Sequence, residues 1–306
     1  MFSEYTLTIL IFVGAWIIAG LGFNIISGYA GQFHLGTAVY MGVGAYTSAL
    51  LTTRFGFPFW TALPVALIFS AIMGFITGLP ALRVKEDFLV VITIGISFVF
   101  ESLLIYLPYF GGPVGIGGIP MPKLFGTSVS KEIYLLMVFA MVIICVALNY
   151  KLINSWIGLA WESIREDEMV TSILGIDTRK FKLYAFIIGA TYCGCGGVLY
   201  AHYMTYITPY DFGFLPSIYI VVMVVFGGIG TIRGTLFGAI FMTMMPELFR
   251  FISEYRNSIY GLLLVFMMLF EPQGILGDRS YIWDKIYSSW KRLTARFRTN
   301  YAPINR

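Results

Sequence analysis

Long apolar runs, each about the length of a membrane helix, fill most of this sequence. A helix needs about 20 apolar residues to cross the hydrocarbon core, where no water satisfies the backbone. Hydrophobic residues make up 58% of the 306-residue chain and charged residues 12%, about half the charge of a soluble protein. We therefore expect an all-α integral membrane protein. The candidate spans are roughly 5–23, 35–53, 58–82, 88–107, 133–150, 183–207, 215–246 and 257–270.

Two glycine-rich stretches interrupt this pattern. The run 215–246 is too long for one crossing and contains FGGIGTIRG at 226–234, with Gly227, Gly228 and Gly230, so it predicts a broken helix and about 8–10 membrane helices. The other stretch, GYAGQFHLGTAVYMGVGAY at 28–46, contains Gln32. Irregular backbone at membrane depth requires covering protein or a water-filled cavity. These residues therefore mark either tight helix packing or a transport pathway.

Glu101 is an acid inside a predicted span, in SFVFESLLIY. Such a charge costs about 2.5–3.5 kcal/mol at the bilayer centre, so it usually faces the interior of the bundle. It is a candidate for the pathway or for helix pairing, unless it reaches the outer interface near Pro108. All three cysteines lie in apolar runs. The Cys193/Cys195 pair lies among small residues in GATYCGCGGVLYA, and we assign it to packing rather than to a metal or redox site.

Basic residues set the orientation, because cytoplasmic loops carry an excess of lysine and arginine. They gather in the turn at 83–85, in the segment 165–182 and in the tail 279–306, all of which we place in the cytoplasm. The segments 108–132 and 208–217 then face outward. We divide the chain into a membrane domain, 1–278, and a basic amphipathic cytoplasmic tail, 279–306, which favours anionic lipid over nucleic acid.

A charged island interrupts the apolar sequence at 162–176, ESIREDEMVTSILGI. Acids precede bases, which suits a helix dipole, and apolar residues share one face at helical spacing. Gly175 reads as a helix stop, and Asp177 as the N-cap of the next span. The island predicts a short amphipathic cytoplasmic helix, and a docking surface for a partner is one interpretation of it. A helix in the membrane interface and a solvated loop are the alternatives.

IREDEMVTSILGIDTRKFKLYAFIIGATYCGCGGVLYAHY, at 164–203, resembles the cytoplasmic loop and helix of branched-chain amino-acid ABC permeases of the LivM-like kind. Four other blocks resemble the same family in order, so that the resemblance covers about 24–277: ISGYAGQFHLGTAVYMGVGAYTSALL, LVVITIGISFVFESLL, SIYIVVMVVFGGIGTIRGTLFGA and IYGLLLVFMMLFEPQGILG. Arg233 departs from the family pattern, since a non-basic residue is common there, and 281–306 matches no family block.

The resemblance implies a multi-pass permease subunit of an ATP-driven importer in the bacterial inner membrane. Such a permease pairs with a second, related permease, two cytoplasmic P-loop ATPases and an external solute-binding protein. The island then resembles the coupling helix that docks on the ATPase, and the residues carried over are Arg165, Glu166, Asp167, Glu168 and Gly175. The sequence has no GxxxxGK[ST] motif, so we expect no cofactor here, with ATP bound and hydrolysed by the partner chains.

Other functions predict different features. The same architecture carries urea or short amides in some relatives of the family. A stand-alone secondary transporter needs its own coupling-ion site, for which Glu101 is the only plausible buried acid. An intramembrane enzyme needs a catalytic cluster that two scattered histidines do not supply.

Replacing two acids of the island tests the docking hypothesis. Asp167→Lys together with Glu168→Lys should leave the protein in the membrane, because neither residue lies in a predicted span. We expect amino-acid uptake to become uncoupled from ATP hydrolysis. Uptake at the unmodified rate in the double variant would contradict the assignment of the island as a coupling helix.

Overall fold

The computed structural model describes residues 4–84, 86–124, 127–248, 261–262, 265, 269 and 274–277. The α-helices are α1 (Glu4–Phe23), α2 (Thr37–Thr53), α3 (Phe59–Ala81), α4 (Glu86–Tyr106), α5 (Lys131–Ile153), α6 (Trp156–Glu166), α7 (Glu168–Ile173), α8 (Thr178–Met204), α9 (Phe214–Gly227) and α10 (Ile232–Leu248). A π-helical turn, η1 (Asn24–Tyr29), continues α1, and the 3-10 turns are η2 (Pro108–Phe110), η3 (Gly112–Val114) and η4 (Pro209–Phe212). Two-residue strands complete the order: β1 (Ile116–Gly117), β2 (Lys123–Leu124), β3 (Thr127–Ser128) and β4 (Tyr206–Ile207).

The all-α membrane fold is confirmed. Six described segments are long and apolar enough to cross a bilayer: Glu4–Tyr29, Phe59–Ala81, Phe88–Tyr106, Lys131–Ile153, Thr178–Met204 and Pro209–Gly227. The shorter helix α2 occupies the expected run 35–53, and α10 occupies the second part of the run 215–246. The break expected within 215–246 lies between α9 and α10. The candidate span 257–270 falls largely, and the tail 279–306 wholly, outside the described residues.

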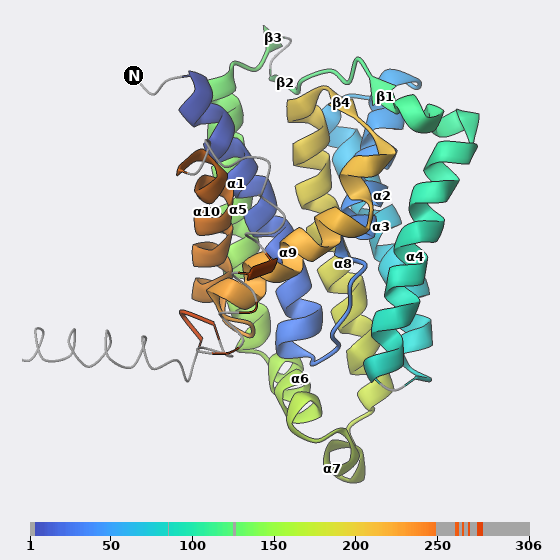
Figure 1. Ribbon diagram of the computed structural model, residues 1–306, viewed down its shortest axis with the longest axis vertical. Coiled ribbons are helices and arrows are strands. Elements are labelled where there is room, and N and C mark those ends of the chain that lie inside the picture. Colours follow the sequence, from blue (N-terminus) through green and yellow to red (C-terminus); the bar gives the residue numbers. More distant parts are fainter. Residues whose placement is uncertain are drawn as a thin grey trace, which may run out of the picture.

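The helices form a bundle in which α1, α2 and α3 pack around α8 (Figure 1). Helix α5 lies beside α1 on one side, and α4 lies on the other side of the bundle (Figure 1). Helices α6 and α7 project from one end, which we call the α7 end. The short strands lie at the opposite end, the strand end, where β1 pairs antiparallel with β4. The segments 108–132 and 208–217 therefore meet at one end, as the orientation argument requires.

Glycines allow the backbones around α8 to touch. A side chain at Gly44 or Gly197 would overlap a backbone carbonyl of the facing helix, that of Gly194 or Met41 respectively. A Cβ at Gly74 on α3 would lie 2.5 Å from the carbonyl oxygen of Phe186. Lipid tails are as apolar as leucine, so helices in a bilayer associate through such close packing and not through the hydrophobic effect. The central position of α8 therefore depends on small residues on its neighbours and on itself.

A pair of glycine-to-alanine variants separates this packing from helix propensity. Alanine is favoured over glycine in a helix by about 1 kcal/mol, so Gly95→Ala, which has open space at its Cβ, should be neutral or stabilising. Gly197→Ala should destabilise the protein by about 1–3 kcal/mol, because the added methyl overlaps the Met41 backbone. Thermal unfolding midpoints of the detergent-purified variants measure the difference. Equal midpoints would contradict the packing described for α8.

Candidate functional site

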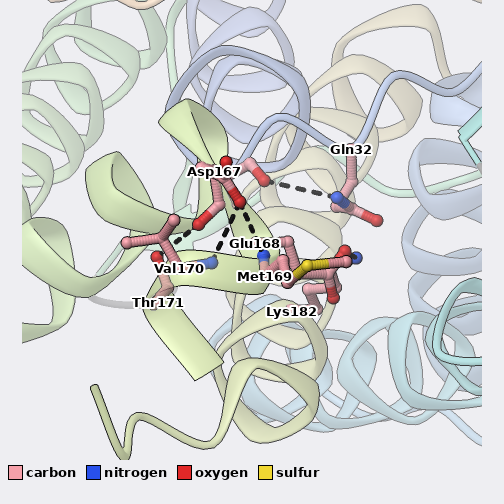
Figure 2. A network of polar contacts seen from close by, with 8 residues as sticks. Gln32, Asp167, Glu168, Met169, Val170, Thr171 and Lys182 are labelled. Carbon is pink, nitrogen blue, oxygen red and sulfur yellow. Dashed lines mark hydrogen bonds and ion pairs between the residues drawn. The ribbon is translucent and has the colours of Figure 1, made fainter. Parts of the chain in front are cut away.

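The charged island divides into two helices at Asp167. This residue has an extended backbone (φ −156°, ψ 109°) between the end of α6 and the start of α7. Its carboxylate accepts hydrogen bonds from the backbone N–H groups of Met169 (2.8 Å) and Val170 (3.0 Å), so it caps α7 (Figure 2). The single helix expected over 162–176 is therefore wrong. An aspartate that binds the first N–H groups of a following helix favours a new start over continuation.

Further polar contacts hold α7 beneath the bundle. The Thr171 hydroxyl donates to the Asp167 carbonyl oxygen (2.7 Å) and shares a hydrogen bond with the Ser163 hydroxyl on α6 (2.7 Å). The Glu168 carboxylate forms an ion pair with the Lys182 ammonium on α8 (2.6 Å; Figure 2). The Lys182 side chain is only 6% exposed, whereas that of Glu168 is 48% exposed. Asp167 and Glu168 thus fold the projecting segment and anchor it to α8.

The outward surface of α7 is apolar. Four large hydrophobic side chains there are 52–77% exposed: Met169, Val170, Ile173 and Leu174. We call these four residues the α7 face. Because exposed apolar side chains gathered on one projecting segment mark a contact surface, the α7 face is the strongest candidate for docking.

The segment ends as the sequence predicted. Gly175 has a positive φ of +87°, which glycine adopts without strain, and no other group lies within 4 Å of its Cβ position. Asp177 caps α8 by accepting from the Lys180 backbone N–H (3.3 Å). The hydrogen bond from the Lys180 side chain lowers the pKa of the Asp177 carboxyl below its usual value. Glu166, another predicted coupling residue, is exposed in the last turn of α6.

Arg165 is oriented differently from the α7 face. Its guanidinium Nη1 donates to the carbonyl oxygen of Gly28 (2.7 Å), in the π-helical turn η1. Asn24, one turn earlier and fully buried, accepts from the Gly230 backbone N–H (2.7 Å) and donates to the Thr231 carbonyl oxygen (3.1 Å). These contacts join α6, the end of α1 and the turn between α9 and α10. Asn24 was not among the predicted site residues, although a polar side chain at the end of an apolar run is a usable signal.

The glycines of the α9–α10 turn serve packing. A Cβ at Gly227 would overlap the carbonyl oxygen of Gly234, and one at Gly228 would lie 2.7 Å from the Gly277 nitrogen. Gly228 and Gly230 also have positive φ angles, +133° and +81°. Arg233, which departs from the family pattern, donates from Nε to the Leu276 carbonyl oxygen (3.2 Å). Backbone atoms of neighbouring segments therefore pack directly against Gly227 and Gly228 and leave no room for side chains there.

Gln32 and Glu101 have different surroundings. Gln32, drawn in Figure 2, is 2% exposed in the covered segment between η1 and α2, and its side-chain amide lies 3.4 Å from the Ala30 carbonyl oxygen. His34 in the same segment is also buried. Glu101 is half-buried, with its carboxylate against Gly213, the residue before α9. A helix N-terminus favours a nearby negative charge, which accounts for an acid at that position.

The chain is similar to known transport proteins. Residues 5–270 match the family described as branched-chain amino acid transport system / permease component. The chain belongs to this family. It is 34% identical over 302 residues to the high-affinity branched-chain amino acid transport system permease protein LivM of Escherichia coli, covering 90% of this chain and 71% of that protein. No solved structure matches the chain.

Two other relatives extend the comparison. A probable LivM permease of Methanocaldococcus jannaschii is 26% identical, covering 90% of this chain and 94% of that protein. The permease LivH of Escherichia coli is 30% identical over 153 residues, covering 49% of this chain and 48% of LivH. The resemblance to branched-chain amino-acid permeases is thus confirmed, and the chain is a multi-pass transport permease of a family that contains transport subunits rather than enzymes.

Because Lys182 is buried and Glu168 is half-exposed, removing each partner of this ion pair should destabilise the permease by a different amount. Glu168→Gln should destabilise the fold by about 1–3 kcal/mol, because it leaves the buried Lys182 ammonium without its carboxylate. Lys182→Met should cost less, since the remaining carboxylate is half-exposed, and adding it to Glu168→Gln should restore most of the loss. Unfolding midpoints in detergent measure all three variants. Equal losses for both single variants would contradict the anchoring role of the pair.

Proposed function

We propose that this permease is one membrane subunit of an ATP-driven importer of branched-chain amino acids in the bacterial inner membrane. The observation that carries the proposal is the α7 face, an exposed apolar surface beside two carboxylates, Asp167 and Glu168, that are already engaged within the chain. A permease that merely spans the bilayer has no need of such a surface outside it. A surface of this kind suits the groove of a partner protein.

The partners follow from what the chain lacks and where its charges lie. The sequence contains no P-loop motif, so we assign ATP binding and hydrolysis to two separate ATPase subunits that dock on the α7 face. Exposed basic residues at the α7 end include Arg83, Lys151 and Arg179, which favours a cytoplasmic position for that end. The strand end then faces outward and receives substrate from a solute-binding protein.

A second permease completes the membrane part of the proposed importer. The chain is similar both to permeases named LivM and, over about half its length, to permeases named LivH. Two related sequences in one transport system favour a heterodimer. The apolar side chains exposed on α3, α4 and α5, such as Phe69, Val99 and Leu136, supply area for lipid and for this second permease.

Branched-chain amino acids are the substrates that the names of the relatives favour, with urea or short amides as the alternative. A stand-alone secondary transporter has weaker support. Glu101, its candidate ion-coupling acid, lies half-buried beside the start of α9, where the helix terminus accounts for its charge.

Reconstitution tests the proposal. The chain, its second permease, the two ATPases and the solute-binding protein are placed in proteoliposomes, and uptake of labelled leucine and labelled urea is followed with and without ATP. We expect leucine uptake that requires ATP and every subunit. An Ile173→Glu variant, which puts a charge on the α7 face, should lose the ATPases on purification. The control Ile143→Glu, which puts the same charge on α5, should retain them in the fraction that inserts into the membrane.

Two results would contradict the proposal. Leucine uptake by the chain alone, without ATP, would make it a secondary transporter. Uptake of urea with no uptake of leucine would contradict the proposed substrate but not the proposal that the chain is a subunit of an ATP-driven importer.

A further inference from the structure

The side chain of Arg165, an exposed residue overall, lies against three glycines. In addition to its hydrogen bond to Gly28, its Nη1 lies 2.7 Å from the position that a Cβ would take at Gly230. Its Cγ lies 3.3 Å from the corresponding position at Gly31. We call Gly28, Gly31 and Gly230, together with Asn24 and Thr231, the glycine junction. A larger residue at Gly31 or Gly230 would press on Arg165, and one at Gly28 would press on the Asn24 side chain and the Gly230 backbone.

The glycine junction joins parts of the chain that are distant in sequence. Gly28 and Gly31 follow α1 in and after the π-helical turn, and Gly230 lies in the turn between α9 and α10. The amide of Asn24 binds the backbone of that turn at both its oxygen and its nitrogen. Arg165 adds α6, so that one cluster ties the coupling segment to three membrane helices.

The geometry of Arg165 differs from that of a docking residue. Part of its donor capacity is used on a backbone carbonyl inside the chain, and the α7 face lies on the next helix. π-Helical turns are common at functional sites, and Gly31 and Gly230 have the positive φ angles (+71° and +81°) that let a turn change shape at low cost. A displacement of α6 therefore acts directly on the backbone near Gly28 and Gly230, where glycines allow the conformation to change.

We propose that Arg165 is a positioning residue that transmits movement of α6 and α7 to the glycine junction, and through it to α1, α9 and α10. It does so through its contacts with Gly28 and Gly230 rather than by binding the ATPase. This inference rests on the proposed function, because the movement is the one that ATP hydrolysis in a docked subunit would impose. Arg165 then couples hydrolysis to transport without contributing to assembly.

The complete importer in proteoliposomes tests the inference through the ratio of leucine uptake to ATP hydrolysis. Arg165→Gln should leave subunit assembly and hydrolysis within about twofold of the unmodified importer, while uptake per ATP falls about tenfold. Arg165→Lys should recover part of that loss, because an ammonium still donates to Gly28 but lacks the second guanidinium arm. Arg179→Gln, a matched change at an exposed arginine of the same end, should behave as the unmodified importer.

Two glycine-to-alanine variants test the contact between Arg165 and Gly230 by changing the glycine instead of the arginine. Gly230→Ala and Gly56→Ala both place alanine at a positive φ, +81° and +67°, but only Gly230 has Arg165 beside it. Gly230→Ala should lower uptake per ATP as Arg165→Gln does, and Gly56→Ala should not. Hydrogen exchange on the unmodified importer gives a measurement without substitutions: adding ATP should change exchange at 24–31 and 228–231 together with 165–174.

Each contrary result has a distinct meaning. Unchanged uptake per ATP in Arg165→Gln would overturn the inference, and so would an exchange response confined to 165–174. Loss of the ATPases from the Arg165→Gln complex would also overturn it and would make Arg165 a docking residue. Failure of the unmodified importer to take up leucine with ATP would contradict the proposed function, and the inference would fall with it.

Discussion

Backbone contact between α8 and its neighbours is the constraint on which the rest of this structure depends. Positions such as Gly197, Gly44 and Gly74 have no room for a side chain, because a backbone of the facing helix occupies that space. In a bilayer this packing, rather than apolar burial, holds helices together. With α8 fixed among α1, α2 and α3, its N-terminus sets where the connected α7 projects. Lys182 near that N-terminus then anchors α7 through Glu168.

Polar groups at the α7 end have two separate uses. Asp167, Glu168 and Thr171 make contacts within the chain that fold the projecting segment, so the surface left for a partner is apolar. Asn24 and Arg165 instead bind backbone groups of two irregular segments, the α9–α10 turn and the π-helical turn. The proposed docking surface and the proposed transmission route are therefore adjacent but are made by different residues.

Span length and composition were sufficient to predict most of the fold. The break within 215–246 was also predictable, because FGGIGTIRG places flexible glycines in the middle of an overlong apolar run. The division of the island at Asp167 was not, since the surrounding residues are good helix formers and a cap depends on local geometry. The pairing of Glu168 with Lys182 spans 14 residues and a turn, so no helical spacing predicts it.

The structure adds contacts that the predicted site residues did not reveal. The residues carried over by resemblance do lie in the projecting segment, but Arg165 points to Gly28 and Asp167 caps α7. The partners of Asn24 could not be inferred, because they lie more than 200 residues away in the sequence. Glycine patterns likewise indicated close packing or a pathway without distinguishing them, and at Gly227 the facing backbone leaves no room for a side chain.

Site-specific photocrosslinking at Ile173 tests the central claim that the α7 face docks an ATPase. Ile173 is 77% exposed on that face, and Tyr106, 81% exposed at the end of α4 near the strand end, provides the matched control. In membranes that contain the complete importer, a photoreactive residue at 173 should crosslink to a P-loop ATPase, and one at 106 should not. An ATPase adduct from 106, or only lipid adducts from 173, would contradict this account.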